Sequence, residues 1–206
     1  MQGKFITLEG IDGAGKTTHL AWLAQVWRAR GVAVRVTREP GGTDLGEQVR
    51  RLLLRPAAPR LHPETEALLM FAARREHIDK VILPALAGGE WVLCDRFSDA
   101  SFAYQAAGSG VEWGKLEILE RWVHASLQPD LTLIFDITPE VGRQRAGSIK
   151  APDRFEGERE DFFERVRQGY LRRAREAPSR VRVIDASLSV GEIQQQLQSI
   201  ANGLCR

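Results

Sequence analysis

The length, composition and charge of the chain exclude several classes of protein. It has 206 residues, of which 43% are hydrophobic. This is enough for one sizeable core and too little for a second full domain, so we expect a single domain over residues 1–206. Lysine and arginine (29) nearly balance aspartate and glutamate (27), giving a net charge of +2. Because this balance provides no broad cationic field, we expect no nucleic-acid partner.

The cysteines and the N-terminal sequence bear on the cell compartment. Cys94 and Cys205 lie far apart without a CxxC pair, which argues against a disulfide framework or a zinc site. The N-terminus MQGKFITLEG has no charged leader followed by a long apolar stretch. No run approaches the roughly 18 apolar residues of a membrane span. We therefore expect a soluble, cytoplasmic protein with no membrane partner.

Short apolar runs alternate with amphipathic stretches along the chain. The runs predict strands at Lys4–Leu8, Val32–Thr37, Trp91–Cys94, Leu131–Phe135 and Val181–Ile184. The amphipathic stretches predict helices at Lys16–Arg30, Leu45–Leu54, Glu64–Leu86, Ser98–Ala106, Val111–Leu127, Pro139–Arg145, Glu160–Glu176 and Val190–Leu204. This alternation is typical of a three-layer α/β fold, a five-stranded parallel sheet flanked by helices. Residues 146–158, AGSIKAPDRFEGE, lack apolar periodicity and are predicted to form a mobile surface segment.

A phosphate-binding motif follows the first predicted strand. Residues 10–17 read GIDGAGKT and match G-x-x-x-x-G-K-[ST] between the strand FITLE and a helix, a context that a chance match would lack. Glycines let backbone N–H groups surround phosphate oxygens at the positive end of the helix. Lys16 is expected to reach the β- and γ-phosphates, and Thr17 to bind Mg²⁺. The predicted ATP-binding residues are Gly10, Ile11, Asp12, Gly13, Ala14, Gly15, Lys16, Thr17 and Thr18.

Two further strand ends carry charged residues. The run WVLC ends in Asp95 and Arg96, at the edge where open α/β sheets bind ligands. Asp95 is a candidate Mg²⁺ ligand, or alternatively a helix N-cap. The strand VAVRVT runs into Arg38, whose planar fork suits a phosphate, although an arginine next to a turn is often an ordinary surface residue. Phosphate loops serve motors, switches, transporters and kinases, so the loop alone does not define the reaction.

Several blocks of the sequence together resemble the bacterial thymidylate kinase family of P-loop nucleoside monophosphate kinases. The blocks are GIDGAGKT, TREPGGT, LLMFAAR, CDRFSDASFAYQ and PDLTLIFDITPEVG, in the family's order and spacing over nearly the whole chain. The resemblance implies a P-loop kinase fold with a lid, transfer of the γ-phosphate of ATP to thymidine 5′-monophosphate for dTTP synthesis, and a homodimer. Two alternatives stay open: a kinase for another small phosphate acceptor, and a nucleotide-dependent regulatory module.

The resemblance assigns the acceptor's phosphate to Arg38 and Arg96, because two anions that approach each other need cations between them. Asp12 would accept a hydrogen bond from the sugar 3′-hydroxyl. The attacking phosphate oxygen is already an anion, so in-line attack on the γ-phosphorus needs no strong general base. The implied catalytic residues are Lys16, Arg96, Arg145 and Lys150.

The resemblance also assigns residues to the thymine base. Phe71 would stack on the base, Met70 would line the same surface, and Arg74 would donate to a base carbonyl. In the block CDRFSDASFAYQ, Ser101 and Gln105 would hydrogen-bond the base, and Tyr104 would crowd the sugar where a ribose carries its 2′-hydroxyl. Without the resemblance, aromatic residues in apolar helices are more often part of the core.

The chain departs from the family in a loop and in the lid. After AYQ the family usually has glycines and a basic residue, whereas residues 106–110 read AAGSG. Gly147 and Ile149 occupy positions where lid arginines are expected. The lid cations that remain are Arg143, Arg145, Lys150 and Arg154. Our hypothesis is that Lys150 or Arg145 closes over the phosphates when residues 146–158 fold down.

The lid hypothesis predicts the kinetics of two variants. Lys150→Ala and Arg145→Ala should each lower turnover much more than acceptor affinity, because a lid cation compensates charge that develops during transfer. Steady-state kinetics with varied acceptor measures both quantities. Unchanged turnover in both variants would remove the lid role.

Overall fold

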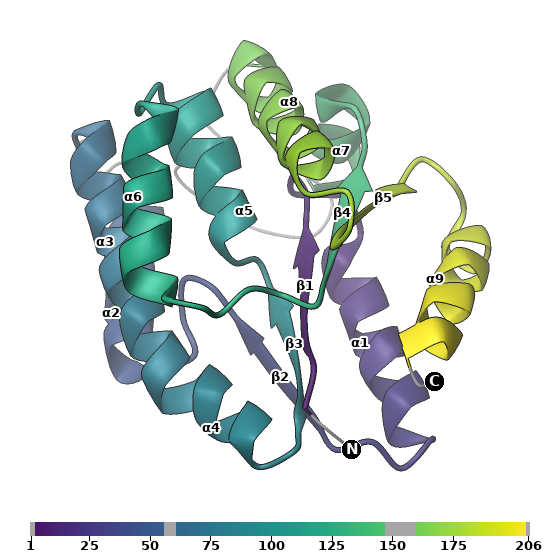
Figure 1. Cartoon of the computed structure of the whole chain (residues 1–206). Coiled ribbons are helices and arrows are strands. Elements are labelled where there is room, and N and C mark those ends of the chain that lie inside the picture. Colours follow the sequence, from purple (N-terminus) through teal and green to yellow (C-terminus); the bar gives the residue numbers. More distant parts are fainter. Residues whose placement is uncertain (1–2, 56–60, 147–159, 205–206) are drawn as a thin grey trace.

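A parallel sheet forms the centre of the computed structural model, which describes residues 3–55, 61–146 and 160–204 (Figure 1). Within these residues the sheet has five strands, and every neighbouring pair is parallel. The strands are β1 (Phe5–Glu9), β2 (Val34–Arg38), β3 (Trp91–Asp95), β4 (Leu131–Asp136) and β5 (Val181–Asp185). Their order is β2-β3-β1-β4-β5, so the carboxyl ends of β1 and β3 lie side by side, where open α/β sheets bind ligands.

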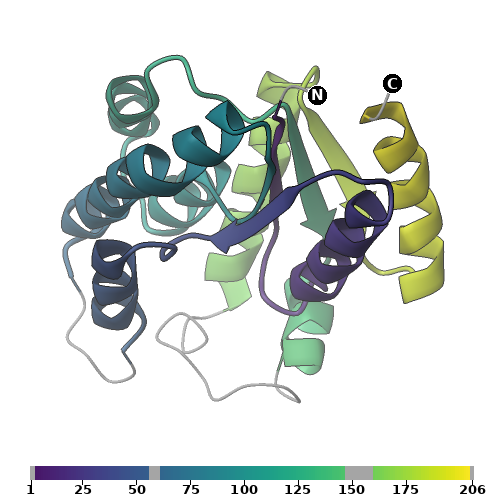
Figure 2. The same ribbon diagram turned by 90° about the horizontal axis from the view of Figure 1, so that it is seen from below.

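Helices cover both faces of the sheet, which confirms the predicted three-layer α/β fold (Figures 1 and 2). The helical segments are α1 (Lys16–Arg28), α2 (Asp44–Leu54), α3 (Pro63–His77), η1 (Ile78–Ile82), α4 (Leu83–Ala87), α5 (Ser98–Ser101), η2 (Phe102–Gly108), α6 (Trp113–His124), α7 (Pro139–Ala146), α8 (Glu160–Glu176) and α9 (Val190–Leu204). Helices α1 and α9 pack together on one face, and α3, α5, α6 and α8 lie on the other. Among the described helices, none combines the length and the apolar character needed to cross a membrane.

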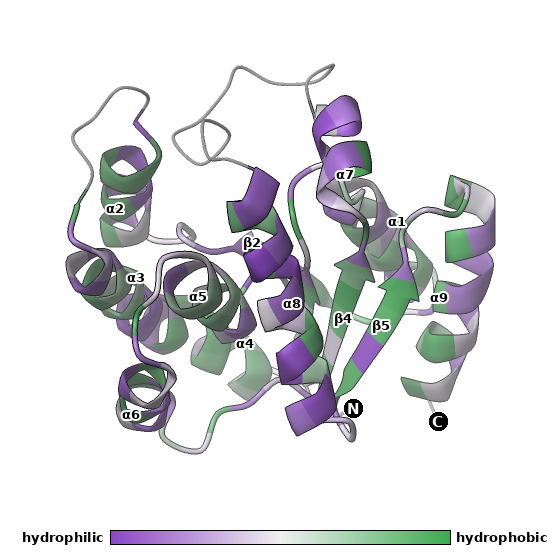
Figure 3. Ribbon diagram, turned by 90° about the horizontal axis from the view of Figure 1, so that it is seen from above, coloured by the Kyte–Doolittle hydropathy of each residue, from purple (hydrophilic) through white to green (hydrophobic). Residues whose placement is uncertain are grey.

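The side chains of β1 point alternately to the two faces of the sheet. Ile6 and Leu8 are buried in the core cluster that contains the residues of α1 and α9. Thr7 and Glu9 face the opposite side and are also fully buried. Buried polar groups need hydrogen-bond partners, which here come from β4, α8 and the turn after β3. Figure 3 shows β4 as largely hydrophobic and α8 as largely hydrophilic, so α8 can supply polar groups to this face.

Two predicted helices contain wide turns that the sequence pattern did not reveal. The predicted helix Glu64–Leu86 consists of α3, η1 and α4, and the predicted helix Ser98–Ala106 consists of α5 and η2. Both η segments are π-helical. In η2 the N–H of Ser109 donates to the carbonyl oxygen of Tyr104, five residues earlier, at 2.9 Å. A hydrophobic period of 3.6 residues describes a regular α-helix and carries no signal for such a turn, which often occurs at functional sites.

Two glycines let α8 lie directly against η2. A Cβ atom added to Gly108 would lie 2.7 Å from Cε2 of Phe162. A Cβ atom added to Gly169 would lie 2.9 Å from Cα of Ala103 and 2.8 Å from Cβ of Ala107. These distances are shorter than normal van der Waals contact, so both positions need glycine if the two helices keep their separation.

This contact predicts opposite effects of alanine at two helical glycines. Replacing a glycine by alanine within a helix normally stabilises the folded protein by up to about 1 kcal/mol. Gly169→Ala should instead destabilise by about 1–3 kcal/mol, because the added methyl group overpacks the contact with η2. Thermal unfolding should show a Tm lower by about 2–10 °C.

Gly203→Ala in α9 is the matched control, since nothing lies within 4 Å of its added Cβ atom. Its Tm should stay the same or rise. A Gly169→Ala protein as stable as the parent would show that α8 and η2 are not in fixed contact.

Candidate active site

Residues 10–17 connect β1 to α1, as the sequence predicts. At Gly13 the backbone has φ of +80°, and an added Cβ atom would overlap the carbonyl oxygen of Gly142 in α7. The position therefore needs glycine for both conformation and space. Lys16 begins α1, and its Nζ donates to the carbonyl oxygens of Gly10 and Ile11, both at 2.9 Å. Burial and the charge of Arg96 lower the pKa of Lys16.

A cavity of ≈ 980 Å³ opens beside this loop. One end is formed by the phosphate loop, α7 and the start of α9. Its lining residues are Asp12–His19, Arg145, Leu188, Ser189, Val190 and Ile193. The other end is formed by the carboxyl ends of β2 and β3 together with α2, α3, α5 and η2. Its lining residues are Arg38, Glu39, Pro40, Arg50, Leu53, Leu54, Glu66, Met70, Asp95, Arg96, Ala100, Tyr104 and Gln105.

Arg96 lies between the two ends of the cavity. Its Nη1 donates to the carbonyl oxygen of Gly10 at 2.8 Å, and its Nη2 donates to Oδ1 of Asp12 at 2.5 Å. The guanidinium also lies over the ring of Tyr104, 5.0 Å from the centroid. Burial alone would lower the pKa of Arg96, but the surrounding phenol and carboxylate oxygens raise it well above its usual value. The guanidinium therefore stays charged beside the phosphate loop.

Two more arginines reach the cavity from the second end. Arg38 ends β2, and its Nη2 donates to both carboxylate oxygens of Glu47 in α2 at 3.0 Å. Arg50, also in α2, is partly buried and donates to the carbonyl oxygen of Pro40 at 3.2 Å. Burial and the charge of Arg38 lower the pKa of Arg50. Together with Arg96, these side chains place three guanidinium groups around one end of the cavity, an arrangement suited to an anionic group.

Three residues predicted to bind the base lie behind the cavity wall. Arg74 is fully buried; its Nε donates to Glu39 at 2.7 Å, and its Nη2 donates to Oγ of Ser101 at 3.1 Å. Phe71 is 1% exposed, and the Arg74 guanidinium lies 4.6 Å from its ring centroid. Neither these residues nor Ser101 lines the cavity, although Nη1 of Arg74 is buried without a hydrogen-bond partner.

Met70, and not Phe71, presents its side chain to the cavity. That Phe71 stacks on the base stays a prediction. The two neighbours lie on different sides of α3, because successive helical residues are separated by about 100°. Phe71 packs inward with Phe97 and Phe102 in the core, while Met70 packs with Leu53 of α2.

The helix pair α3 and η2 sets the orientation of Gln105, which lines the cavity as Tyr104 does. Nε2 of Gln105 donates to Oε1 of Glu66 at 2.8 Å within the buried wall. Since a carboxylate only accepts hydrogen bonds, the amide oxygen of Gln105 points away from Glu66. This oxygen is buried and has no hydrogen-bond partner. The wall therefore contains an acceptor on Gln105 as well as the donor on Arg74.

The predicted metal ligands both line the cavity, Thr17 at the phosphate-loop end and Asp95 at the carboxyl end of β3. Asp95 ends β3, and its Oδ1 is buried without a hydrogen-bond partner. Thr17 is exposed in the first turn of α1. Among the described side chains there is no group of three or more His, Cys, Asp or Glu residues that could hold a metal by themselves. An ion at this place would therefore need ligand atoms from a bound phosphate or water as well.

Of the predicted lid cations, Arg145 in α7 reaches the cavity. Its Nη1 donates to the carbonyl oxygen of Ala186 at 2.7 Å, and its Nη2 donates to that of Ser187 at 3.4 Å. Arg143 is exposed, and its Nη2 lies 3.8 Å from Oε2 of Glu160 at the start of α8. Lys150 and Arg154 lie outside the described residues, as does most of the predicted lid.

Four residues around the site were missed by the sequence reasoning. They are Glu9, Arg50, Glu66 and Tyr170. Glu9 had a recognisable signal, since a carboxylate at the end of the buried strand FITLE resembles the position of Asp95 after WVLC. Arg50 and Glu66 lie in ordinary amphipathic helices, so only the packing of α2 and α3 brings them to the cavity.

The parallel sheet, the phosphate loop between β1 and α1, and the cavity with cations at both ends define a P-loop nucleotide kinase. Comparisons with known proteins give the family. A family model described as thymidylate kinase matches residues 8–197. The chain belongs to the thymidylate kinase family.

Individual relatives agree with this assignment. The chain is 59% identical to a thymidylate kinase from Nitrosospira multiformis, over 96% of this chain and 96% of that protein. It is 60% identical to one from Nitrosomonas europaea, over 97% of this chain and 92% of that protein. Among solved structures, thymidylate kinase from Ehrlichia chaffeensis matches with a TM-score of 0.76 and 33% identity, covering 98% of this chain and 99% of that one.

Proposed function

We propose that this chain transfers the γ-phosphate of ATP to the 5′-phosphate of thymidine monophosphate, giving ADP and thymidine diphosphate for dTTP synthesis. The observation that carries the proposal is the cavity that joins the phosphate loop to the three guanidinium groups of Arg38, Arg50 and Arg96. One continuous space allows two phosphorylated molecules to meet end to end. Membership of the thymidylate kinase family supports this reading.

ATP binds at the phosphate-loop end. The loop N–H groups and Lys16 hold its β- and γ-phosphates, and the start of α9 offers apolar side chains to the rest of the nucleotide. Asp95 and Thr17 fit a Mg²⁺ ion, since the unpartnered Oδ1 of Asp95 and the Thr17 hydroxyl are both oxygen donors. A Mg²⁺ ion held there would neutralise negative charge on the phosphates of ATP.

Thymidine monophosphate binds at the other end. Its 5′-phosphate lies among Arg38, Arg50 and Arg96, and its sugar lies near Asp12 and the ring of Tyr104. These cations separate and orient two anions that would otherwise repel each other. A phosphate oxygen of the acceptor attacks the γ-phosphorus in line, and no general base is required.

Thymine is selected by the buried wall. Nη1 of Arg74 is a donor and Oε1 of Gln105 is an acceptor, and both lack partners. This pair matches the O4 acceptor and the N3–H donor of thymine, whereas cytosine presents the opposite pattern at these two positions. Leaving either group unpaired costs about 1–3 kcal/mol, so a mismatched base binds less well. Met70 lines the cavity beside the base, and Phe71 lies next to it in α3.

A panel of acceptors tests the proposed function. ADP formation with ATP and Mg²⁺ should be fast with thymidine monophosphate, at least tenfold slower with deoxycytidine monophosphate, and slow without acceptor, since a base mismatch of about 1.4 kcal/mol is tenfold.

Two results would contradict the proposal. Equal rates with a different nucleoside monophosphate would point to a kinase for another acceptor. Slow hydrolysis that no acceptor stimulates would point to a nucleotide-dependent regulatory module.

We also propose a cytoplasmic location, where ATP is available, and a homodimer. Large apolar side chains are exposed on two adjacent helices: Leu68 of α3 is 55% exposed, and Ile118 and Trp122 of α6 are 58% and 79% exposed. Ile118 and Trp122 are four residues apart and so share one face of α6. Figure 1 shows α3 and α6 side by side at one edge of the molecule. A second copy of the chain would cover this patch by two-fold symmetry.

Sedimentation velocity tests the dimer. The parent should sediment as a dimer, and Trp122→Glu with Ile118→Glu should shift it to a monomer, because both charges would be buried at the interface. Val183→Glu is the control, since Val183 is 45% exposed but lies on β5. A monomeric parent, or a dimer that persists in the double variant, would contradict the proposal.

A further inference from the structure

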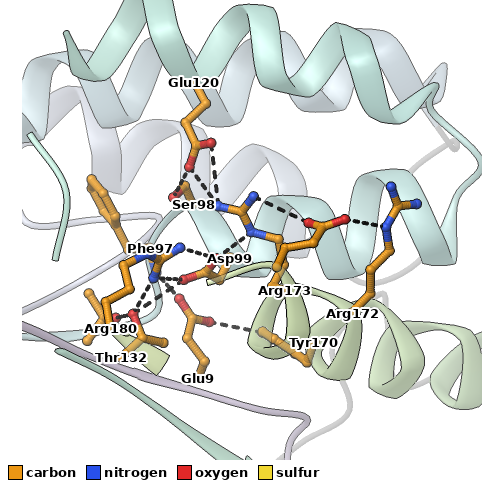
Figure 4. Close-up of polar contacts among 12 residues, drawn as sticks. Glu9, Phe97, Ser98, Asp99, Glu120, Thr132, Tyr170, Arg172, Arg173 and Arg180 are labelled. Carbon is orange, nitrogen blue, oxygen red and sulfur yellow. Dashed lines mark hydrogen bonds and ion pairs between the residues drawn. The ribbon is translucent and has the colours of Figure 1, made fainter. Parts of the chain in front are cut away.

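A buried carboxylate and a buried phenol lie next to Arg96 and have no role in the function described above. Glu9, the last residue of β1, is 0% exposed, and Tyr170, in the middle of α8, is 1% exposed. Figure 4 shows the two side chains pointing toward one another between the sheet and α8. A carboxylate without solvent is costly unless it is paired, so its partners indicate what it is for.

The partners of Glu9 form a chain of hydrogen bonds that ends on Arg96. Oε1 of Glu9 accepts from the backbone N–H of Phe97 at 2.7 Å. Oε2 accepts from the hydroxyl of Tyr170 at 3.1 Å. The same hydroxyl accepts from Nη1 of Arg96 at 3.0 Å. Glu9 therefore contacts the backbone next to Arg96 directly and the Arg96 side chain through Tyr170.

The direction of each hydrogen bond is determined by the chemistry of the groups. A guanidinium has donors only, so the Tyr170 hydroxyl must accept from Arg96. Its own hydrogen is then available only for Glu9, whose two oxygens accept. While Glu9 is ionised, the Tyr170 hydroxyl satisfies both neighbours by donating to Glu9 and accepting from Arg96. This chain of hydrogen bonds restricts the orientation of the guanidinium.

The backbone of Arg96 needs this support. Its φ is +69°, in the left-handed region that non-glycine residues rarely adopt. Such a conformation costs on the order of 1–3 kcal/mol and persists where surrounding contacts enforce it. The N–H of Arg96 donates to the carbonyl oxygen of Leu8 at 2.9 Å, and the next N–H, that of Phe97, donates to Glu9. Both peptide groups that flank the strained Cα are thus held by β1.

Tyr170 is itself held in place by a buried ion cluster that includes Arg173 of the same helix. Arg173, three residues further along α8, donates through Nε to Asp99 at 2.6 Å and through Nη2 to Glu120 at 3.0 Å. Arg180 donates to the same Asp99 at 2.8 Å and 3.0 Å (Figure 4). These contacts join α8 to the start of α5 and to α6. The Tyr170 hydroxyl is therefore presented to Arg96 by a braced helix.

The electrostatics of Glu9 reflect its burial. Burial, and then the negative charge of Asp99, raise the pKa of Glu9 to about 8, although Arg96, the Phe97 N–H and the Tyr170 hydroxyl lower it. The groups that the carboxylate orients are thus the same groups that favour its charged form. Loss of the Tyr170 hydroxyl would weaken both effects.

We propose that Tyr170 and Glu9 are positioning residues that hold the Arg96 guanidinium in its orientation toward the acceptor's phosphate. The proposal rests on the proposed function, in which Arg96 compensates charge between the acceptor and the γ-phosphate. Misorientation of such a group by a fraction of an ångström is expected to lower turnover without abolishing folding.

A double-mutant cycle tests the positioning role. Tyr170→Phe, which removes only the hydroxyl, should lower kcat with thymidine monophosphate about tenfold and leave KM for ATP within twofold, because the cation near the acceptor is affected and the phosphate loop is not. In an Arg96→Ala background, Tyr170→Phe should change kcat less than twofold, since the group that it orients is absent. Glu9→Gln should likewise lower kcat in the parent and change kcat less than twofold in the Arg96→Ala background.

The controls separate positioning from general destabilisation. Thr7→Val removes another fully buried hydroxyl on the same face of β1, 2.8 Å from the Thr132 hydroxyl and without contact to Arg96. It should lower Tm comparably but leave kcat within twofold. Phosphoryl transfer by slow variants stays measurable with radiolabelled ATP and enzyme in excess. The Tm of each variant confirms that it is folded.

Three outcomes would contradict either the positioning role or the proposed function. An unchanged kcat in Tyr170→Phe would remove the positioning role, as would an equal loss in the parent and the Arg96→Ala background. A parent that does not phosphorylate thymidine monophosphate would instead refute the proposed function, so the two failures are distinguishable.

Discussion

The site depends on one guanidinium whose position is fixed from both sides. Arg96 donates to the phosphate loop through Gly10 and Asp12, and it lies in the wall of the cavity that extends toward Arg38 and Arg50. Two phosphorylated molecules can approach each other only if positive charge lies between them. The turn after β3, with its left-handed residue, brings the charge to this place.

The core supports that position through close helix contact. Gly108 and Gly169 let α8 approach η2, so Tyr170 of α8 and Tyr104 of η2 come within 6.4 Å of each other, measured between ring centroids. Arg96 contacts both residues, one through its hydroxyl and one through its ring. The close packing of α8 against η2 is therefore linked to the orientation of a charged group in the cavity.

Local patterns were sufficient where a single element determines the outcome. The central strands β1, β3 and β4 appeared as nearly continuous apolar runs because both of their faces are covered. The phosphate loop combined fixed spacing with a strand before it and a helix after it. Local patterns did not reveal the direction of a side chain where that direction depends on its neighbours. Met70 and Phe71 are adjacent in an apolar helix, and only the packing of α3 between α2 and the sheet turns Met70 to the cavity.

The sequence by itself determined the α/β class, the phosphate loop with Lys16 and Thr17, and the resemblance to thymidylate kinases, because each depends on spacing along the chain. The tertiary structure decided which residues meet. Glu9 and Tyr170 are 161 positions apart, and Arg74 meets Glu39 across 35 positions. No periodicity connects residues so distant in the chain; they come together because burial forces each polar group to find a partner among the groups that the sheet brings within reach.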